Sequence, residues 1–321
     1  MIIHKDFPLS EILWYKIGPT ARYLIDVENI EDAKKAIEFI KSEKLPHAFF
    51  VGTGSNLIFS DSYFDGAVVR FIAPKKSSIV LANDKTIEAF AGESLDSVIQ
   101  FAFDQKLLGL EWAGGLPGTV GAAVRGNVGA FGGEIKDIVK EVQVLEVTDR
   151  KIELKTLKRF ELKFSYRSSV IKKKRNLIVV AVQFRLEQGD NASLQRARQE
   201  YLNNIEYRKR RHPMELPNCG SVFKNISDPE EVKMILEIFP DLSEKIKRDW
   251  HGKVAMGYLI KRLELAEFRV GNAQISPKHC NFIVNLGGAT SNDVLTIIRK
   301  IQDTFADTFG FTPEVEVEIV N

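Results

Sequence analysis

The stretch of sequence around which this chain is organised runs from Leu108 to Asp137 and reads LGLEWAGGLPGTVGAAVRGNVGAFGGEIKD. It contains nine glycines and few bulky or charged side chains. Each glycine costs conformational entropy on folding and adds little burial, so such a segment persists where something must approach the backbone closely. Backbone N–H groups in successive tight turns form a concavity that holds a pyrophosphate or a flat ring. A flexible linker would lack the apolar side chains spaced through this stretch, so we interpret it as a ligand cradle.

Composition limits the classes of protein to consider. A length of 321 residues suits two domains. With 45 basic and 43 acidic residues the net charge is +2, which gives no reason to expect nucleic acid or a membrane as partner. No apolar run approaches a membrane-spanning length, and no signal peptide is recognisable. The two cysteines, Cys219 and Cys280, favour a reduced, cytoplasmic setting, and the scattered histidines predict no metal site.

A second glycine-rich turn lies in the first quarter of the chain. A helix is predicted over residues 31–44 with Asn29 as its N-cap, and a strand over residues 47–51 runs directly into Gly52–Asn56. Open α/β domains hold phosphate at such a strand-to-glycine turn. The turn does not match a Rossmann fingerprint, because Leu57 stands where the third glycine belongs and no helical pattern follows. We therefore predict a dinucleotide site of another kind.

Periodicity predicts the remaining elements. Strands are expected near residues 78–91, 142–147, 151–157 and 176–186, and helices after Ser94, over 193–211, after Asp228 and over 254–265. The last helix is expected to be capped at Ser291 or Asn292 and to stop at Gly310, followed by a strand over 311–320. Residues 1–190 therefore read as an α+β unit and residues 205–305 as a small α/β domain. The basic cluster Arg208–Arg211 ends the 193–211 helix, where it either caps the helix dipole or contacts phosphate.

Short motifs spread over nearly the whole chain share one resemblance. They are Gly52–Asn56 with Gly66, Gly115–Gly121, Asn127 with Gly129-Ala130 and Gly133-Glu134, Tyr166-Arg167-Ser168, Gly220–Asn225, Ser276–His279 with Asn281–Asn285, and Pro313-Glu314-Val315. Each motif alone is weak evidence. Together, and in this order, they resemble the family of UDP-N-acetylenolpyruvoylglucosamine reductases. The short interval between Arg167 and Ser221 is similar to the second type of that family, which lacks an inserted tyrosine loop.

The resemblance implies an α+β fold. We expect an FAD-binding domain of the vanillyl-alcohol-oxidase (PCMH) type over residues 1–200, in two subdomains of about 1–70 and 71–200. A smaller α/β substrate-binding domain would follow over 201–305. Residues 306–321 would form a C-terminal strand that carries Glu314 and returns toward the FAD domain.

The resemblance also implies a reaction. Family members use FAD and NADPH to reduce UDP-N-acetyl-3-O-(1-carboxyvinyl)-glucosamine (UDP-GlcNAc-enolpyruvate) to UDP-N-acetylmuramate, in bacterial peptidoglycan synthesis and hence cell wall biogenesis, cell shape and cell division. By family match, Ser221 protonates the α-carbon, Arg167 binds the carboxylate and Glu314 assists. Neither glycine cradle contains a histidine, so we expect non-covalent FAD. The expected cofactor-binding residues are Gly52, Thr53, Gly54, Ser55, Asn56, Leu57, Gly115, Pro117, Gly118, Thr119, Gly121, Ala122, Asn127, Gly129 and Ala130.

Two places depart from the family pattern. Glu264-Leu-Ala-Glu267 stands where the family has Gly-Leu-Lys-Gly, so Ala266 replaces a lysine that could contact the diphosphate. Arg125-Gly126 replaces an apolar pair. Diphosphate contact is therefore expected from the Lys209–Arg211 cluster and Lys224. The full set of expected substrate-binding residues is Tyr166, Lys209, Arg211, Lys224, Asn225 and His279.

Other functions remain open at this stage. Without the family context, Arg167 reads as a surface salt bridge, Ser221 as a turn residue and Glu314 as a strand-edge charge. The alternatives are another FAD-dependent oxidoreductase of the same fold, or a degenerate paralogue that only binds a nucleotide-sugar. The presence of all three residues favours the reductase. We expect a cytoplasmic monomer with a small-molecule substrate.

Overall fold

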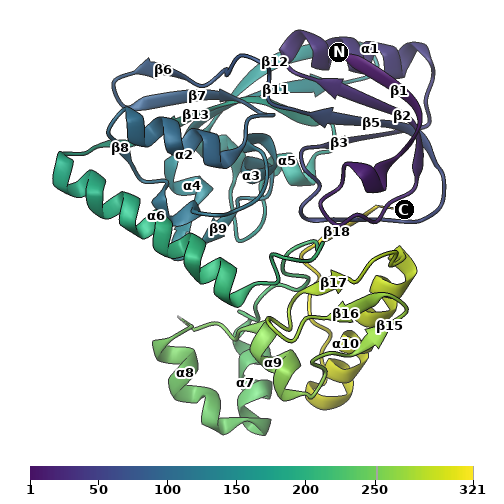
Figure 1. Cartoon of the computed structure of the whole chain (residues 1–321), viewed down its shortest axis with the longest axis vertical. Coiled ribbons are helices and arrows are strands. Elements are labelled where there is room, and N and C mark those ends of the chain that lie inside the picture. The colour runs from purple at the N-terminus through teal and green to yellow at the C-terminus, as the bar shows by residue number, and fades with distance from the viewer. Residues whose placement is uncertain (251, 321) are drawn as a thin grey trace. The chain divides into compact units, whose positions relative to one another are not determined.

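The computed structural model describes residues 1–250 and 252–320. The chain forms two compact units, of which unit 1 comprises Met1–Phe7, Ala21–Thr53 and Tyr63–Arg210 (Figure 1). Unit 2 comprises Pro8–Thr20, Gly54–Ser62 and the chain from Arg211 onward. The domain boundaries expected at residues 200 and 305 remain predictions. The two N-terminal segments of unit 2 were not anticipated.

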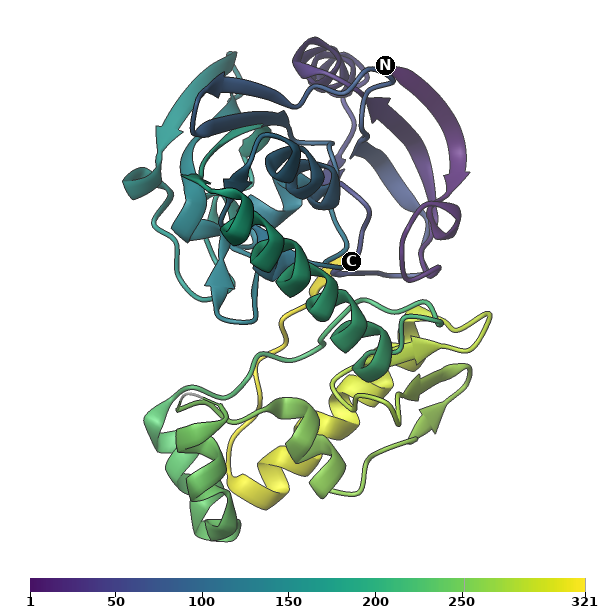
Figure 2. The same ribbon diagram turned by 60° about the vertical axis from the view of Figure 1, so that its left-hand side comes forward.

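Unit 1 contains two sheets (Figures 1 and 2). The first has the order β1 (Ile2–Pro8), β2 (Thr20–Val27), β5 (Phe64–Phe71), β3 (His47–Val51), and β5 pairs in parallel with both β2 and β3. The second has the order β12 (Ile152–Lys158), β11 (Val139–Val147), β13 (Leu177–Arg185), β7 (Thr86–Phe90), β6 (Val80–Asn83), and all its strand pairs are antiparallel. Two short antiparallel pairs are added, β8 (Leu107–Leu108) with β14 (Glu187–Gln188) and β9 (Gly129–Ala130) with β10 (Gly133–Glu134).

The helices of unit 1 follow their local sequence signals. They are α1 (Ile30–Ser42), α2 (Leu95–Asp104), α3 (Val120–Arg125), α4 (Ile135–Ile138), α5 (Val170–Lys173) and α6 (Asn191–Arg211). The predicted caps are confirmed: Asn29 accepts a hydrogen bond from the Asp32 N–H (2.8 Å), and Ser94 accepts one from the Ser97 N–H (2.9 Å). Helix α3 was not predicted. It lies inside the glycine-rich stretch, where we expected only turns.

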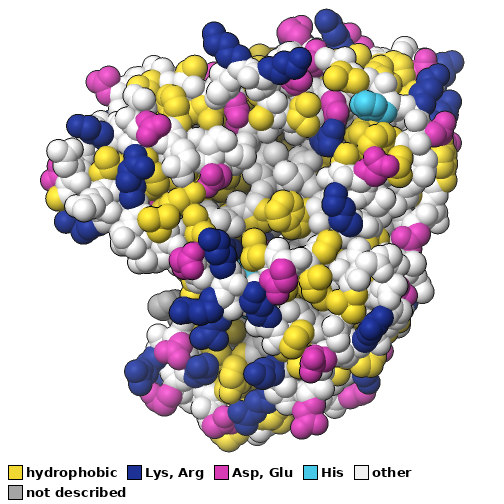
Figure 3. Space-filling view, viewed as in Figure 1, with side chains coloured by type: hydrophobic (Ala, Val, Ile, Leu, Met, Phe, Trp, Pro, Cys, Tyr) yellow, Lys and Arg dark blue, Asp and Glu magenta, His cyan; other side chains and the backbone are white. Residues whose placement is uncertain are grey.

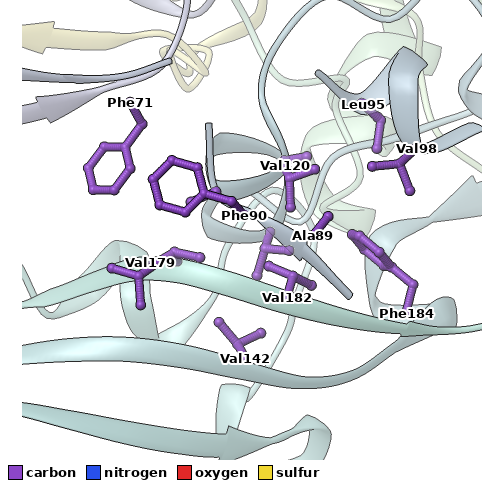
Figure 4. Close-up of a cluster of buried hydrophobic side chains, with 14 of the residues drawn as sticks. Phe71, Ala89, Phe90, Leu95, Val98, Val120, Val142, Val179, Val182 and Phe184 are labelled. Carbon is purple, nitrogen blue, oxygen red and sulfur yellow. The ribbon is translucent and has the colours of Figure 1, made fainter. Parts of the chain in front are cut away.

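One hydrophobic core joins both sheets of unit 1. Figure 4 shows Phe71 of the first sheet beside Phe90 of the second, with Val120 of α3 among the same buried side chains. Val120 is fully buried, so the glycine-rich stretch is fastened to the core at this residue. Burial of an aliphatic side chain of this size stabilises the fold by roughly 1.5–3 kcal/mol. The glycine turns on either side therefore lie on a fixed support.

Unit 2 has its own core, built on a small antiparallel sheet. The sheet has the order β15 (Arg269–Val270), β16 (Ala273–Ile275), β17 (Ile283–Asn285), and its helices are α7 (Pro229–Ile238), α8 (Ser243–Arg248), α9 (Met256–Arg262) and α10 (Ser291–Phe309). Helix α10 packs against β15 and β16. A parallel pair, β4 (Leu57–Phe59) with β18 (Glu318–Val320), ties residues 54–62 to the C-terminal tail. Tyr15 and Ile17 are buried in this core, which explains why the segment Pro8–Thr20 belongs to unit 2.

Two predicted element ends were wrong. The N-cap of α10 is Thr290, not Ser291 or Asn292: Thr290 is extended, and its side chain accepts from the Asp293 N–H (3.1 Å). The Ser291 hydroxyl instead donates to Asp61 (2.8 Å). The predicted strand over 311–320 is regular only in β18.

The fold class is α+β, as predicted. On the face shown in Figure 3, basic and acidic side chains are interspersed, in keeping with the net charge of +2. Among the helices of residues 1–250 and 252–320, none combines the length and apolar character needed to cross a bilayer. Cys219 and Cys280 are buried and not joined by a disulfide.

Candidate active site

The two glycine-rich turns meet in unit 1. A Cβ atom placed on Gly52, at the end of β3, would lie 2.3 Å from Oγ1 and 2.8 Å from Cγ2 of Thr119, just before α3. Only glycine permits this approach, because real Cβ contacts of that length do not occur. The two predicted cradles are therefore in direct contact at these two residues.

Hydrogen bonds from neighbouring residues anchor the second cradle but do not use the N–H groups of Gly118 and Thr119. The Leu95 N–H donates to the Gly118 carbonyl (3.2 Å), and the N–H groups of Val120 and Gly121 donate to carbonyls of residues 93 and 91 (2.9 Å each). Gly118 has φ +126°, a conformation that side chains other than hydrogen rarely adopt. In the described part of the chain, the N–H groups of Gly118 and Thr119 donate no hydrogen bond. They are available to an anionic oxygen at the start of α3.

Thr53 supplies a further free group beside this contact. Its Oγ1 is buried and has no hydrogen-bond partner among residues 1–250 and 252–320. An unsatisfied buried hydroxyl costs about 1–3 kcal/mol and is a rare feature of a finished protein interior. A phosphate oxygen or a flavin carbonyl would satisfy it. A bound flavin dinucleotide fits this site. It would accept hydrogen bonds from the N–H groups of Gly118 and Thr119 and satisfy the Thr53 hydroxyl, and the glycine turns would let it approach the backbone.

The rest of the first cradle lies in unit 2. Gly54 has φ +68°. The Asn56 carbonyl accepts from the Glu318 N–H (3.1 Å), and Leu57 begins β4, so both residues are fastened to the C-terminal tail. Outside unit 2, Ala122 lies within α3, and a Cβ on Gly115 would meet Arg208 Cδ at 3.1 Å. The cofactor roles expected for these residues remain predictions.

A buried polar network surrounds Asn127. Its amide donates to Glu134 and to the Ser165 carbonyl (3.0 Å each), and its oxygen accepts from the Lys136 N–H (3.0 Å). Burial alone would raise the pKa of Glu134, but hydrogen bonds from Lys136 and Asn127 and the charge of Arg167 outweigh burial and lower this pKa. Because the Asn127 side chain is fully committed to protein groups, its observed role is support, and direct cofactor contact remains a prediction.

Arg167 stands at the tip of a tight turn. Ser165 and Ser168 exchange two backbone hydrogen bonds (3.0 Å each), and Arg167 has a left-handed φ of +55° between them. Its guanidinium donates from Nη2 to the Gly129 carbonyl (2.8 Å) and lies over the Tyr166 ring, 5.1 Å from its centroid. The predicted carboxylate-binding arginine is therefore oriented by the same hairpin that carries Gly129 and Ala130.

The segments that carry Ser221 and Glu314, distant in sequence, are paired in unit 2. The Val222 carbonyl accepts from the Glu316 N–H (2.7 Å), and the Lys224 N–H donates to the Glu314 carbonyl (3.0 Å). The segments of the predicted proton donor and its partner are thus paired side by side. In addition, the Lys224 ammonium forms an ion pair with the Glu314 carboxylate. A substrate oxyanion that binds Lys224 would compete with this ion pair.

The other predicted substrate residues lie in different settings. The side chain of Asn225 accepts from the Met256 N–H (3.1 Å) at the start of α9. Burial lowers the pKa of His279, whose ring lies 4.9 Å from that of Phe282, which favours a neutral imidazole. Lys209 and Arg211 are exposed, and Lys209 pairs with Glu206 (3.2 Å). Their contacts with substrate remain predictions.

Arg208, which the expected substrate-binding set leaves out, is the buried member of the basic cluster Arg208–Arg211. It is only 7% exposed, its Nε donates to the Gly114 carbonyl (3.0 Å), and its guanidinium lies over the Phe131 ring. Burial lowers its pKa to about 10, so it remains charged at neutral pH. Helical spacing could have identified it, because it continues the buried face of α6 formed by Ala197, Tyr201 and Asn204.

Comparisons with known proteins identify the family. A family model described as the C-terminal domain of UDP-N-acetylenolpyruvoylglucosamine reductase matches residues 212–320, and one described as an FAD binding domain matches residues 21–154. The UDP-N-acetylenolpyruvoylglucosamine reductase of Lactobacillus johnsonii is 36% identical over 99% of this chain and 94% of its own length. That of Listeria innocua is also 36% identical, over 99% and 95%. The solved structure of UDP-N-acetylenolpyruvylglucosamine reductase from Thermus caldophilus aligns with a TM-score of 0.76 and 27% identity, covering 100% of both chains. The chain therefore belongs to the family of UDP-N-acetylenolpyruvoylglucosamine reductases, which are FAD-dependent oxidoreductases.

Proposed function

We propose that this protein reduces UDP-GlcNAc-enolpyruvate to UDP-N-acetylmuramate in peptidoglycan precursor synthesis, with NADPH as the source of electrons. The observation that carries the proposal within unit 2 is the pairing of the segment of Ser221 with that of Glu314. A nucleotide-sugar sensor would have no need to pair these two segments. Another flavin oxidoreductase of the same fold would share the glycine cradles but would not need this pair.

The chemistry divides between the cofactor and the side chains of this chain. FAD, when bound, would supply the hydride chemistry for reduction of the substrate's vinyl carbon, with NADPH as the reductant. In our proposal the backbone N–H groups of Gly118 and Thr119 and the Thr53 hydroxyl hold the dinucleotide. Hydride addition leaves negative charge spread from the α-carbon into the substrate carboxylate, and this charge requires a fixed cation. Arg167 provides a permanently charged planar fork for it.

Ser221 would complete the reaction by protonating the α-carbon. A serine hydroxyl is a weak acid in water, so it must be held in position and assisted by the developing enolate charge. Glu314 would assist as a hydrogen-bonding partner. The ion pair between Lys224 and Glu314 supports a site in which the carboxylate is oriented before substrate arrives.

The two half-reactions test this assignment. Because reduction by NADPH does not use the serine proton, S221A should bind FAD and bleach with NADPH like the wild type. Reoxidation by substrate should slow by about 10²–10⁴-fold, the usual contribution of a positioned acid. S221C should retain more activity than S221A, since a thiol can still donate. Stopped-flow flavin absorbance measures both steps. Equal slowing of reduction and reoxidation would mean that Ser221 is a turn residue and not the proton donor.

We also propose that the protein is a cytoplasmic monomer that binds no nucleic acid or membrane; the near-balance of 45 basic and 43 acidic residues supports the absence of a polyanionic partner. Light scattering of the holoenzyme measures the oligomeric state, and a dimer would contradict the proposal.

A further inference from the structure

The backbone that follows Ser221 pairs with residues 314–316 and is also bonded by one buried side chain, that of Asn281. Asn281 is 3% exposed, and its side chain bonds both polar groups of Phe223: the Phe223 N–H donates to Oδ1 (3.0 Å), and Nδ2 donates to the Phe223 carbonyl (2.8 Å). The Asn281 carbonyl also accepts from the Val222 N–H (2.8 Å). Residues 222 and 223 therefore make three hydrogen bonds to a single asparagine.

This arrangement adds to the short backbone pairing of the segment with residues 314–316. A residue in an antiparallel strand exchanges an N–H and a carbonyl bond with one neighbour, and the Asn281 amide offers the same two groups to Phe223. On the other side of Ser221, the Gly220 N–H donates to Asn218 Oδ1 (3.0 Å), and Gly220 has φ +78°. The serine is thus bracketed by two asparagine-held points on a segment that belongs to no regular strand.

We propose that Asn281 is a positioning residue for Ser221, an inference that rests on the proposed function. The Asn281 side chain holds both polar backbone groups of Phe223, so the Ser221 hydroxyl close by in the chain is aimed at one place rather than distributed over several. A displacement of about 1 Å in a reacting group costs on the order of 100-fold in rate. Loss of the Asn281 amide should therefore affect proton delivery far more than it affects reduction by NADPH.

The chain contains a matched control in Asn285, the last residue of β17, the strand that follows Asn281. Asn285 is also 3% exposed, and its oxygen accepts from the N–H groups of Gly287 (2.9 Å) and Ala289 (3.0 Å). Its amide donates to the Tyr15 carbonyl (3.2 Å), and its side chain makes no hydrogen bond to residues 218–226 within the described chain. N281A and N285A remove the same group with the same burial, but only N281A frees the segment of Ser221.

The test compares the holoenzymes of N281A, N285A and S221A with the wild type. In N281A, reoxidation by substrate should slow by about 10- to 100-fold while reduction by NADPH is unchanged. N285A should show no selective slowing. Hydrogen exchange should show lost protection of the Phe223 amide in N281A, but of the Gly287 and Ala289 amides in N285A. N281D keeps an acceptor for the Phe223 N–H but turns a second acceptor toward the Phe223 carbonyl, so it should show the same selective slowing. If N281A does not fold, N281D takes its place in the test.

The outcomes separate this inference from the proposed function. If S221A reoxidises slowly but N281A and N281D behave like N285A, Asn281 is a structural residue only and the inference is overturned. If S221A reoxidises at the wild-type rate, Ser221 is not the proton donor, and the proposed function fails at that step together with the inference. Selective slowing in S221A and N281A, with unchanged reduction, supports both.

Discussion

The contact between Gly52 and Thr119 predicts the effect of one added methyl group on flavin binding. In G52A the new Cβ would lie 2.3 Å from Thr119 Oγ1, 2.8 Å from Cγ2 and 3.1 Å from Cβ. The φ of Gly52 lies outside the left-handed region, so alanine is not excluded by the backbone and the effect is purely steric. Because ordinary contacts begin at 3.4 Å, the two loops must separate by about 1 Å.

The separation of the two loops determines how strongly G52A should weaken FAD binding. Overpacking of this kind costs about 1–3 kcal/mol. If the strain falls on the cofactor-bound form, the dissociation constant for FAD should rise about 5- to 150-fold, since 1.4 kcal/mol corresponds to a factor of ten. If the strain falls equally on the apoprotein, the Tm of the apoprotein drops instead. We expect the first outcome to dominate, because bound FAD holds both loops in one arrangement.

The assay is titration of apoprotein with FAD, followed by flavin fluorescence, with a thermal melt of each variant. G126A is the matched control: its Cβ would meet only the Ala122 carbonyl at an ordinary 3.5 Å, so FAD should bind normally. T119A removes the two closest atoms and should rescue G52A, with a favourable coupling of about 1–2 kcal/mol in the double-mutant cycle. Wild-type affinity and melting temperature for G52A, or no rescue by T119A, would refute the contact between the two cradles.

Three further changes have expected outcomes. Glu264, with φ +59°, and Glu267, with φ +64°, occupy left-handed positions, so replacing both with glycine should stabilise the protein by about 1 kcal/mol in chemical denaturation; an equal gain from alanine at these positions would exclude relief of backbone strain as the cause. Burial raises the pKa of the Cys219 thiol to about 12, so iodoacetamide at pH 8 should leave Cys219 unmodified in the native protein and alkylate it after unfolding, as read by mass spectrometry; rapid native labelling would contradict its burial. Neutralising Lys209 and Arg211 should raise the substrate KM with little change in kcat, and a loss of kcat at constant KM would remove them from diphosphate binding.

The sequence predicts those elements whose signals are local. The caps Asn29, Ser94 and Asp228 and the glycine stop at Gly310 are all where the pattern indicated, because a cap requires only a few neighbouring residues. The N-cap of α10 was displaced by one residue since Thr290, Ser291 and Asn292 are all good caps. Assignment of Pro8–Thr20 to unit 2 depends on Tyr15, whose hydroxyl donates to the Ile283 carbonyl (2.9 Å). No local signal encodes a partner so distant in sequence.

For the site, too, the sequence predicts the local features but not the contacts that depend on tertiary structure. Glycine content predicted both cradles, but their contact through Gly52 and Thr119 depends on strand pairing. The basic cluster was recognised, yet only the helical period separates buried Arg208 from its exposed neighbours. The ion pair between Lys224 and Glu314 could not be predicted, because the residues are brought together by tertiary structure. Sequence therefore predicts which groups are present, and the fold determines which of them meet.

In both units a buried asparagine side chain holds irregular backbone next to a predicted catalytic residue. Arg167 lies in a tight turn and Ser221 on an irregular segment, so neither is held by a continuous sheet ladder. In unit 1 the buried amide of Asn127 donates to the carbonyl of Ser165, where the turn of Arg167 begins. In unit 2 the buried amide of Asn281 bonds the backbone that follows Ser221. A buried amide costs free energy unless all its groups are bonded, so an asparagine of this kind tolerates only one arrangement of the segment it holds. Rigidity at an irregular segment therefore comes from a satisfied polar side chain rather than from secondary structure.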